Sequence, residues 1–148
     1  MNKDELIYLA VPYTHKDKNV ILDRVRRLNT VAFKILASGK HVFSPVTHCH
    51  PLAEIGDLPK DWEFWKAYDT VMLSRCDRVW VLMLEGWKES TGVNAEIKIA
   101  EELGKPVEYI DESIVPFNVG DIIKVQPLNQ PSGLAYYLSP HKKLTDDY

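Results

Sequence analysis

The hydrophobic and polar positions of the chain follow two periodicities in turn. Leu6 to Val11 is a short, continuous apolar run, which is typical of a strand buried on both faces. Between Lys18 and Ser38 the apolar residues recur every three or four positions, at Ile21, Val25, Leu28, Ala32, Ile35 and Leu36. This spacing predicts a helix with one buried stripe, which Gly39 is placed to end.

The same two periodicities continue as far as residue 110. The predicted elements are, in chain order, a strand over 41–44, a loop over 45–60, a helix over 62–74, a strand over 78–84, a helix over 91–103 and a strand over 106–110. The loop is predicted because residues 45–60 contain three prolines and Gly56. Asp61 is placed to cap the helix that follows.

Strands that alternate with helices predict an α/β fold. We expect a single-domain, doubly wound, Rossmann-like or flavodoxin-like parallel sheet of four to five strands. This domain is predicted to span 1–110. Residues 111–148 contain four prolines and little periodicity, so we expect an arm with one edge strand near 122–125, packed on the domain or on a neighbouring subunit.

Composition and charge exclude several classes of protein. The 148 residues suffice for one domain with a sizeable core, and a net charge of −3 without a basic stripe argues against a nucleic-acid polymer as partner. Two cysteines make no disulfide framework, and no apolar run is long enough for a bilayer, so a cytoplasmic protein is expected.

The most informative stretch is the turn from Ser90 to Glu96. It follows the most hydrophobic predicted strand and opens a helix, so free backbone N–H groups and the positive end of the helix dipole meet there. Glu96 lies about one turn into the helix. An anion-binding turn beside a carboxylate suits a substrate with a phosphate or hydroxyl near a reactive carbon.

Each candidate carboxylate also has a structural interpretation. Glu96 could be a first-turn acid that favours the helix dipole, and Asp69 could be a solvated helix residue. For Asp77, which directly precedes a strand, a turn or capping role is favoured over catalysis.

The triplet His48-Cys49-His50 has three interpretations. In an extended segment both imidazoles would lie on one side, and zinc accepts His and Cys ligands. No further ligand lies at a matching spacing, so no metal and no cofactor are predicted. A loop that hydrogen-bonds a substrate through His48 is favoured, and a purely structural loop is the alternative.

Aromatic residues gather in the predicted helix over 62–74. Core packing explains most of Trp62, Phe64, Trp65 and Tyr68, although one ring could stack on a flat base. Tyr13 lies just past the first strand and could reach the site. Tyr8 lies inside that strand, and its buried hydroxyl would need a partner such as Glu96.

Together these residues resemble the nucleoside 2-deoxyribosyltransferase superfamily. The matching segments are 7–13, Gly39 with Phe43-Ser44-Pro45, Asp69, Cys76-Asp77, Ser90-x-Gly92-x-x-x-Glu96 and Gly104-Lys105-Pro106-Val107. The chain is most similar to the small DUF1937 branch, through the Ser-Pro-x-Thr-His-x-His-Pro motif over 44–51, the Trp-x-Phe-Trp motif over 62–65 and the Gly-Trp-x-x-Ser motif over 86–90. The resemblance covers residues 6 to about 110.

The resemblance implies a reaction at an N-glycosidic bond. Glu96 matches a nucleophile that attacks the anomeric carbon, Asp69 matches an aspartate for base recognition and proton transfer, and Tyr8 matches a tyrosine that orients the nucleophile. Pro45, Gly92, Tyr13 and Trp65 are further candidates for substrate binding. Related enzymes are homo-oligomers, so a homodimer or larger assembly is expected.

Ser90 bears on which substrate is used. Transferases that act on nucleosides tend to have an aspartate there, whereas serine resembles a branch that hydrolyses deoxynucleoside 5′-monophosphates. That branch has a basic loop after its first strand, for which His15, Lys16 or Arg24 would have to substitute. We therefore expect cleavage of a nucleoside or its monophosphate, with hydrolysis of the monophosphate slightly favoured. Base exchange, a non-catalytic nucleotide-binding module and an N-glycosidase for another ribosyl compound are the alternatives.

Overall fold

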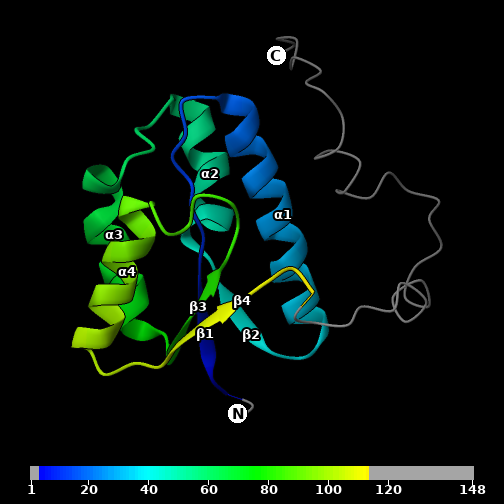
Figure 1. The fold of residues 1–148 in the computed structure, drawn as a ribbon, viewed down its shortest axis with the longest axis vertical. Coiled ribbons are helices and arrows are strands. Elements are labelled where there is room, and N and C mark those ends of the chain that lie inside the picture. The colour runs from blue at the N-terminus through cyan, green and yellow to red at the C-terminus, as the bar shows by residue number, and fades with distance from the viewer. Residues whose placement is uncertain (1–3, 114–148) are drawn as a thin grey trace, which may run out of the picture. The chain divides into compact units, whose positions relative to one another are not determined.

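The computed structural model describes residues 4–113, which form four strands and four helices (Figure 1). In chain order these are β1 (Leu6–Ala10), α1 (Lys18–Ala37), β2 (His41–Phe43), α2 (Pro45–Gly56), α3 (Trp62–Arg75), β3 (Arg78–Leu82), α4 (Thr91–Glu102) and β4 (Val107–Ile110). All strand pairs are parallel, in the order β2-β1-β3-β4. The predicted α/β class and parallel sheet are confirmed.

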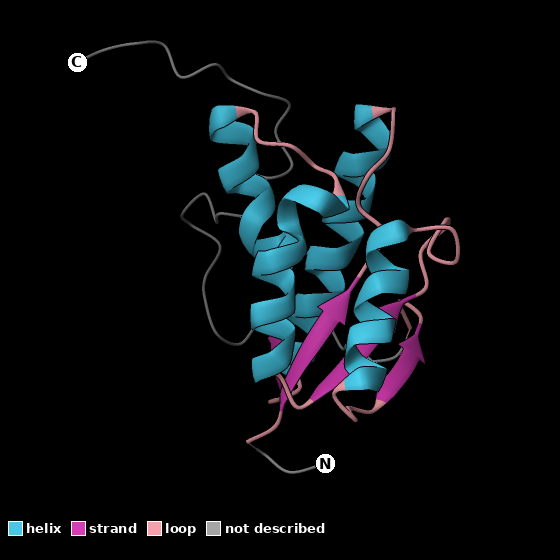
Figure 2. Cartoon of the chain, turned by 90° about the vertical axis from the view of Figure 1, so that its left-hand side faces the viewer, coloured by secondary structure: helices cyan, strands magenta, loops and turns pink. Residues whose placement is uncertain are grey.

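Helices cover both faces of the sheet, so its central strands are buried (Figure 2). Alternate residues of β1 point to opposite faces, because side chains alternate along a strand. Ile7 and Leu9 pack with α1, whereas Tyr8 and Ala10 pack with α3 and α4. The odd–even alternation of β1 thus decides which side chains can reach a site on the α3–α4 side.

The prediction of a loop over residues 45–60 is wrong, because residues 45–56 form α2. Pro45 occupies the first helical position, where its fixed φ suits a helix and its missing N–H costs nothing. Pro51 lies inside the helix and leaves one backbone carbonyl without its usual partner. Burial of Cys49, His50 and Ala53 offsets that cost, and tertiary packing therefore overrides the local signal.

The other predicted elements are present, with ends that differ by one or two residues. Asp61 caps α3 by accepting a hydrogen bond from the backbone N–H of Phe64 at 3.1 Å. Asp77 has the predicted structural role, since its Oδ2 accepts a hydrogen bond from the N–H of Leu6 at 2.7 Å.

The predicted arm lies outside the described residues from position 114 onward, and so does its edge strand near 122–125. Within residues 4–113, no helix combines the length and the apolar character needed to cross a membrane.

Candidate active site

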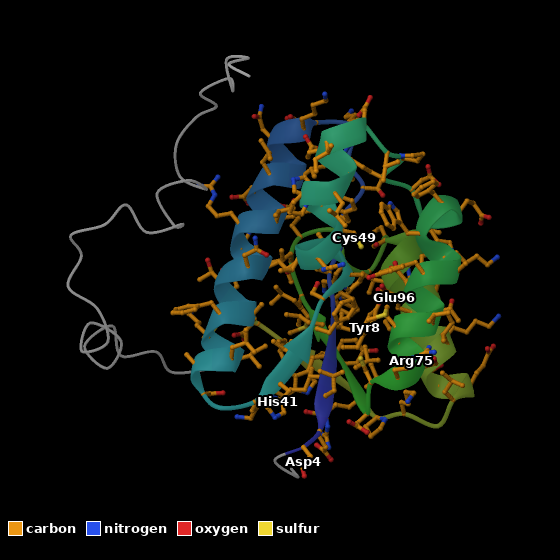
Figure 3. The ribbon with its side chains drawn as sticks, turned by 180° about the vertical axis from the view of Figure 1, so that it is seen from behind. Asp4, Tyr8, His41, Cys49, Arg75 and Glu96 are labelled. Carbon is orange, nitrogen blue, oxygen red and sulfur yellow. The ribbon has the colours of Figure 1, made fainter. Side chains whose placement is uncertain are left out.

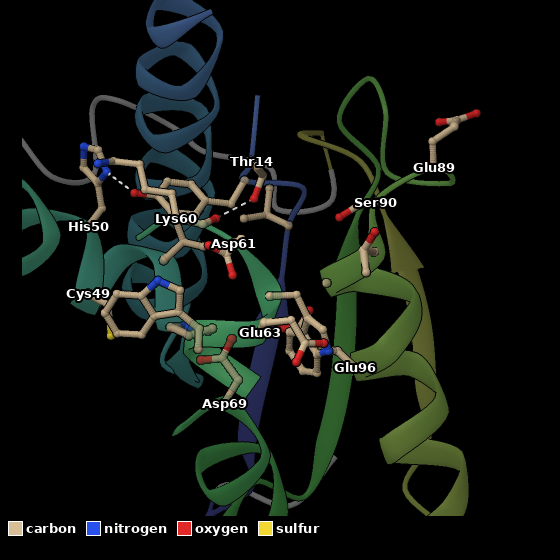
Figure 4. Close-up of a pocket in the computed structure, with 18 residues that line it drawn as sticks. Thr14, Cys49, His50, Lys60, Asp61, Glu63, Asp69, Glu89, Ser90 and Glu96 are labelled. Atoms are coloured by element: carbon tan, nitrogen blue, oxygen red, sulfur yellow. Dashed lines mark hydrogen bonds between the residues drawn. The ribbon is translucent and has the colours of Figure 1, made fainter. Parts of the chain in front are cut away.

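A cavity of about 430 Å³ opens at the carboxyl edge of the sheet (Figure 4). In parallel α/β sheets this edge is where ligands bind, because the loops after the strands and the N-termini of the following helices meet there. Its walls come from the segment after β1 and from the N-terminal parts of α2, α3 and α4. The candidate site residues named from the sequence were predicted to lie at this same edge.

Glu96 and Tyr8 meet at the floor of this cavity. The Tyr8 hydroxyl donates a hydrogen bond to Oε1 of Glu96 at 2.7 Å, so the contact predicted from the sequence is present (Figure 3). Tyr8 is fully buried and lies behind Glu96, whereas Glu96 itself lines the cavity and is 5% exposed. Burial raises the pKa of Glu96 to about 8, although the hydrogen bond from Tyr8 opposes this rise.

Asp69 is a second buried carboxyl group in the same cavity. It projects from α3, is 8% exposed, and its Oδ1 has no hydrogen-bond partner within residues 4–113. Burial raises its pKa to about 7. A buried carboxyl oxygen without a partner is costly, and because Asp69 lines the cavity this oxygen is available to a group bound there.

The start of α4 contributes hydrogen-bond donors to the cavity wall. Ser90 is the N-cap, and its Oγ accepts a hydrogen bond from the N–H of Val93 at 3.3 Å. The N–H groups of Thr91 and Gly92 are the first two of the helix and have no partner inside it. Ser90, Thr91 and Gly92 all line the cavity, so the predicted donor-rich turn faces it.

The opposite wall combines ordered rings. The Tyr13 hydroxyl and Nδ1 of His50 are 2.6 Å apart, and the two rings meet edge to face. The indole N–H of Trp65 donates to the carbonyl oxygen of Pro59 at 2.7 Å, which holds that ring in one orientation. Tyr13, Pro45 and Trp65, which are candidates for substrate binding, line the cavity.

His48 lies outside the cavity lining, and His50 lines it instead. Two residues that are two positions apart in a helix point about 200° away from each other, whereas in the extended segment that we assumed they would share a side. The ring of His48 stacks against Tyr68 with a centroid distance of 6.4 Å, and it also contacts Phe43. Only knowledge that residues 45–56 are helical would have selected His50.

The connection between α2 and α3 forms the upper rim of the cavity, which no pattern in the sequence indicated. The hydroxyl of Thr14 donates to the carbonyl oxygen of Lys60 at 2.5 Å. Lys60 also pairs with Glu54 at 3.1 Å and Asp57 at 3.7 Å. The Thr14 hydrogen bond attaches the rim to the segment after β1, and the two ion pairs attach it to the end of α2. Lys60, Asp61, Trp62 and Glu63 line the cavity.

The cavity is acidic. Its lining contains five carboxylate side chains, Asp61, Glu63, Asp69, Glu89 and Glu96. Lys60 is its one lysine, and this ammonium group already has two carboxylate partners outside the lining. His15, Lys16 and Arg24, the cations considered for a phosphate, are absent from the lining.

Arg24 instead connects two loops beside the cavity. Its guanidinium donates to the carbonyl oxygens of Tyr13 and Thr14 after β1, and to that of Glu85 after β3. Gly86 leaves room for this group, since a Cβ there would lie 2.8 Å from an Arg24 nitrogen. Gly86 also has a φ of +88°, which other residues rarely adopt.

We expect Gly86→Ala to lower the free energy of unfolding by about 1–3 kcal/mol, because it strains the backbone and displaces Arg24. Urea denaturation measures this loss. Gly56→Ala is the matched control, since no atom lies within 4 Å of its Cβ position and its φ is not positive. Equal stability of the two variants would contradict the proposed connection by Arg24.

Among residues 4–113, no group of three or more His, Cys, Asp or Glu side chains is arranged to hold a metal ion. Cys49 and Cys76 are both buried free thiols.

Comparison with known proteins identifies the family. Residues 5–112 match the model of the family described as "Domain of unknown function (DUF1937)", so the chain belongs to that family. No curated protein matches it. Among solved structures, it is similar to a 2-deoxyribosyltransferase from the psychrotolerant bacterium Bacillus psychrosaccharolyticus, with 24% identity over 78% of each chain and a TM-score of 0.48.

Proposed function

We propose that this protein cleaves the N-glycosidic bond of a nucleoside with Glu96 as the nucleophile. The observation that carries the proposal is a pair of buried carboxyl groups, Glu96 and Asp69, in one cavity of suitable size, with Tyr8 bonded to Glu96. A protonated carboxyl group beside an ionised one is the usual equipment for acid catalysis with a carboxylate nucleophile. The resemblance of the sequence motifs supports the same assignment.

In the first step, an Oε atom of ionised Glu96 forms a bond to the anomeric carbon while the bond from that carbon to the base nitrogen breaks. The electron pair leaves with the base, which takes a proton from the carboxyl group of Asp69. Tyr8 holds the Glu96 side chain in place through its hydrogen bond. Water or a second base then takes the sugar and releases Glu96.

The charge of the cavity favours the unphosphorylated nucleoside over the monophosphate that Ser90 suggested. A phosphate dianion would meet the carboxylates of Asp61, Glu63 and Glu89 and no unpaired cation among the described residues of the lining, whereas a 5′-hydroxyl can bond to the N–H groups of Thr91 and Gly92 without repulsion. We expect kcat/KM for a nucleoside to exceed that for its 5′-monophosphate by about tenfold or more at low salt.

Measurement of released base by chromatography, over a panel of nucleosides and their monophosphates, tests both the activity and this preference. Raising the salt concentration should narrow the difference, because salt screens the repulsion. Faster release from the monophosphates would restore the phosphate assignment.

Base exchange is the second candidate, and the ordered rings of Trp65 and His50 favour it, because a planar acceptor base could occupy the same wall. Incubation with a deoxynucleoside donor and an excess of a different free base distinguishes hydrolysis from base exchange. Free deoxyribose without a new nucleoside indicates hydrolysis. A new nucleoside whose yield rises with the acceptor base indicates transfer.

A further inference from the structure

The acidic side chains of the cavity are not balanced by cations among residues 4–113. None of its five carboxylate side chains forms a salt bridge with any residue in the range 4–113. Elsewhere in the same range, carboxylates do find cations, as Glu5 and Glu108 do with Arg78. Asp61, Glu63 and Glu89 supply negative charge, and a bound cation would favour the ionised forms of the buried Glu96 and Asp69, whose pKa values burial raises. Such a site is complementary to a cation.

Two further features fit a flat cation. The indole rings of Trp62 and Trp65 line the cavity, and the face of an indole attracts a positive charge. The indole N–H of Trp65 is held by its hydrogen bond to the carbonyl oxygen of Pro59. Trp62 lies against the start of α4, where a Cβ on Gly92 would be 3.8 Å from the Trp62 ring. Asp69 adds a buried oxygen that has no hydrogen-bond partner in the described part of the chain.

We propose that the base recognised in this cavity is positively charged, so that the substrate is a nucleoside whose base is alkylated at a ring nitrogen. This inference rests on the proposed function and specifies its substrate class. The positive charge binds against the indole rings and carboxylates, and the sugar extends toward Glu96 and the start of α4.

A cationic base also simplifies the chemistry. When the bond between the anomeric carbon and the base nitrogen breaks, its electron pair neutralises the base, which leaves without a proton. Glu96 bonds to the anomeric carbon, and water later replaces it, releasing the sugar, the Glu96 carboxylate and one proton. The bound cation also favours the ionised form of Glu96, which burial otherwise disfavours.

Binding to a Glu96→Gln variant tests the inference without turnover. Calorimetry at about pH 6, where the methylated ring keeps its charge, compares 7-methylguanosine with guanosine, and the two corresponding 2′-deoxynucleosides with each other. We expect the charged ligand of a pair to bind about tenfold more tightly, and added salt to reduce this ratio.

A second substitution assigns the preference to the cavity. Glu63→Gln, added to the same variant, should reduce the ratio by about threefold, because it removes one cavity charge. Glu101→Gln is the matched control, since it removes the same charge from an exposed position near the end of α4, outside the cavity. A ratio near one, or a ratio that responds equally to both substitutions, overturns the inference.

Base release by the unaltered enzyme separates this inference from the proposed function. Release from neutral nucleosides without any binding preference would retain the glycosidase and reject the cationic base. A clear binding preference without release from either kind of nucleoside would retain the cation site and reject the glycosidase.

Discussion

Glu96→Gln should lower the rate of base release by about 10³-fold or more, while the protein stays folded. Glutamine has nearly the same shape, and its carbonyl oxygen can still accept the hydrogen bond from Tyr8. It cannot, however, form the bond to the anomeric carbon that the proposed mechanism requires. Single-turnover assays with chromatography of the released base measure the loss.

The stability of this variant gives an independent check. Burial raises the pKa of Glu96 to about 8, above its value in the unfolded chain. Glu96 therefore lowers the free energy of unfolding as pH rises from the unfolded pKa to the folded pKa. Glutamine does not ionise, and the melting temperature of Glu96→Gln at about pH 8 should equal or exceed that of the unaltered protein. A lower melting temperature with activity retained would return Glu96 to a structural role.

The second large effect concerns pH. Glu96 must be ionised to attack, and Asp69 must be protonated to release a neutral base, so kcat/KM for neutral nucleosides should follow a bell with its maximum between about 7 and 8. The two limbs belong to the interacting pair and not to either residue alone. Initial rates from about pH 5 to 10 record the profile.

Asp69→Asn distinguishes the two groups. Without the acid, release of a neutral base should slow by about 10²–10⁴-fold, and the fall at high pH should disappear because only Glu96 still titrates. If the base is cationic, the rate of its release in Asp69→Asn should fall by a factor at least about tenfold smaller than the factor for a neutral base, since a cationic base leaves without a proton. An unchanged bell in Asp69→Asn would remove Asp69 from the proposed mechanism.

Tyr8→Phe is a positioning control for the same profile. The hydrogen bond from Tyr8 lowers the pKa of Glu96, so Tyr8→Phe in the Asp69→Asn background, where only Glu96 still titrates, should move the remaining acidic limb to higher pH. A purely structural tyrosine would change stability and leave the limb where it was.

The sequence by itself determined the parallel α/β fold and the edge at which the site lies. The two periodicities are local properties, and the rule that ligands bind at the carboxyl ends of parallel strands converts them into a location. The hydrogen bond between Tyr8 and Glu96 could also be predicted from the sequence, because a tyrosine inside a buried strand needs a partner for its hydroxyl.

Tertiary structure decided the form of α2 and the character of the cavity. The prolines at 45 and 51 are a local signal against a helix, and only burial of residues such as Cys49 and Ala53 overrides them. That helix brings His50 to the cavity in place of His48. The concentration of unpaired carboxylates and the raised pKa values of Glu96 and Asp69 arise from burial and from the meeting of four distant segments, which no local pattern in the sequence records.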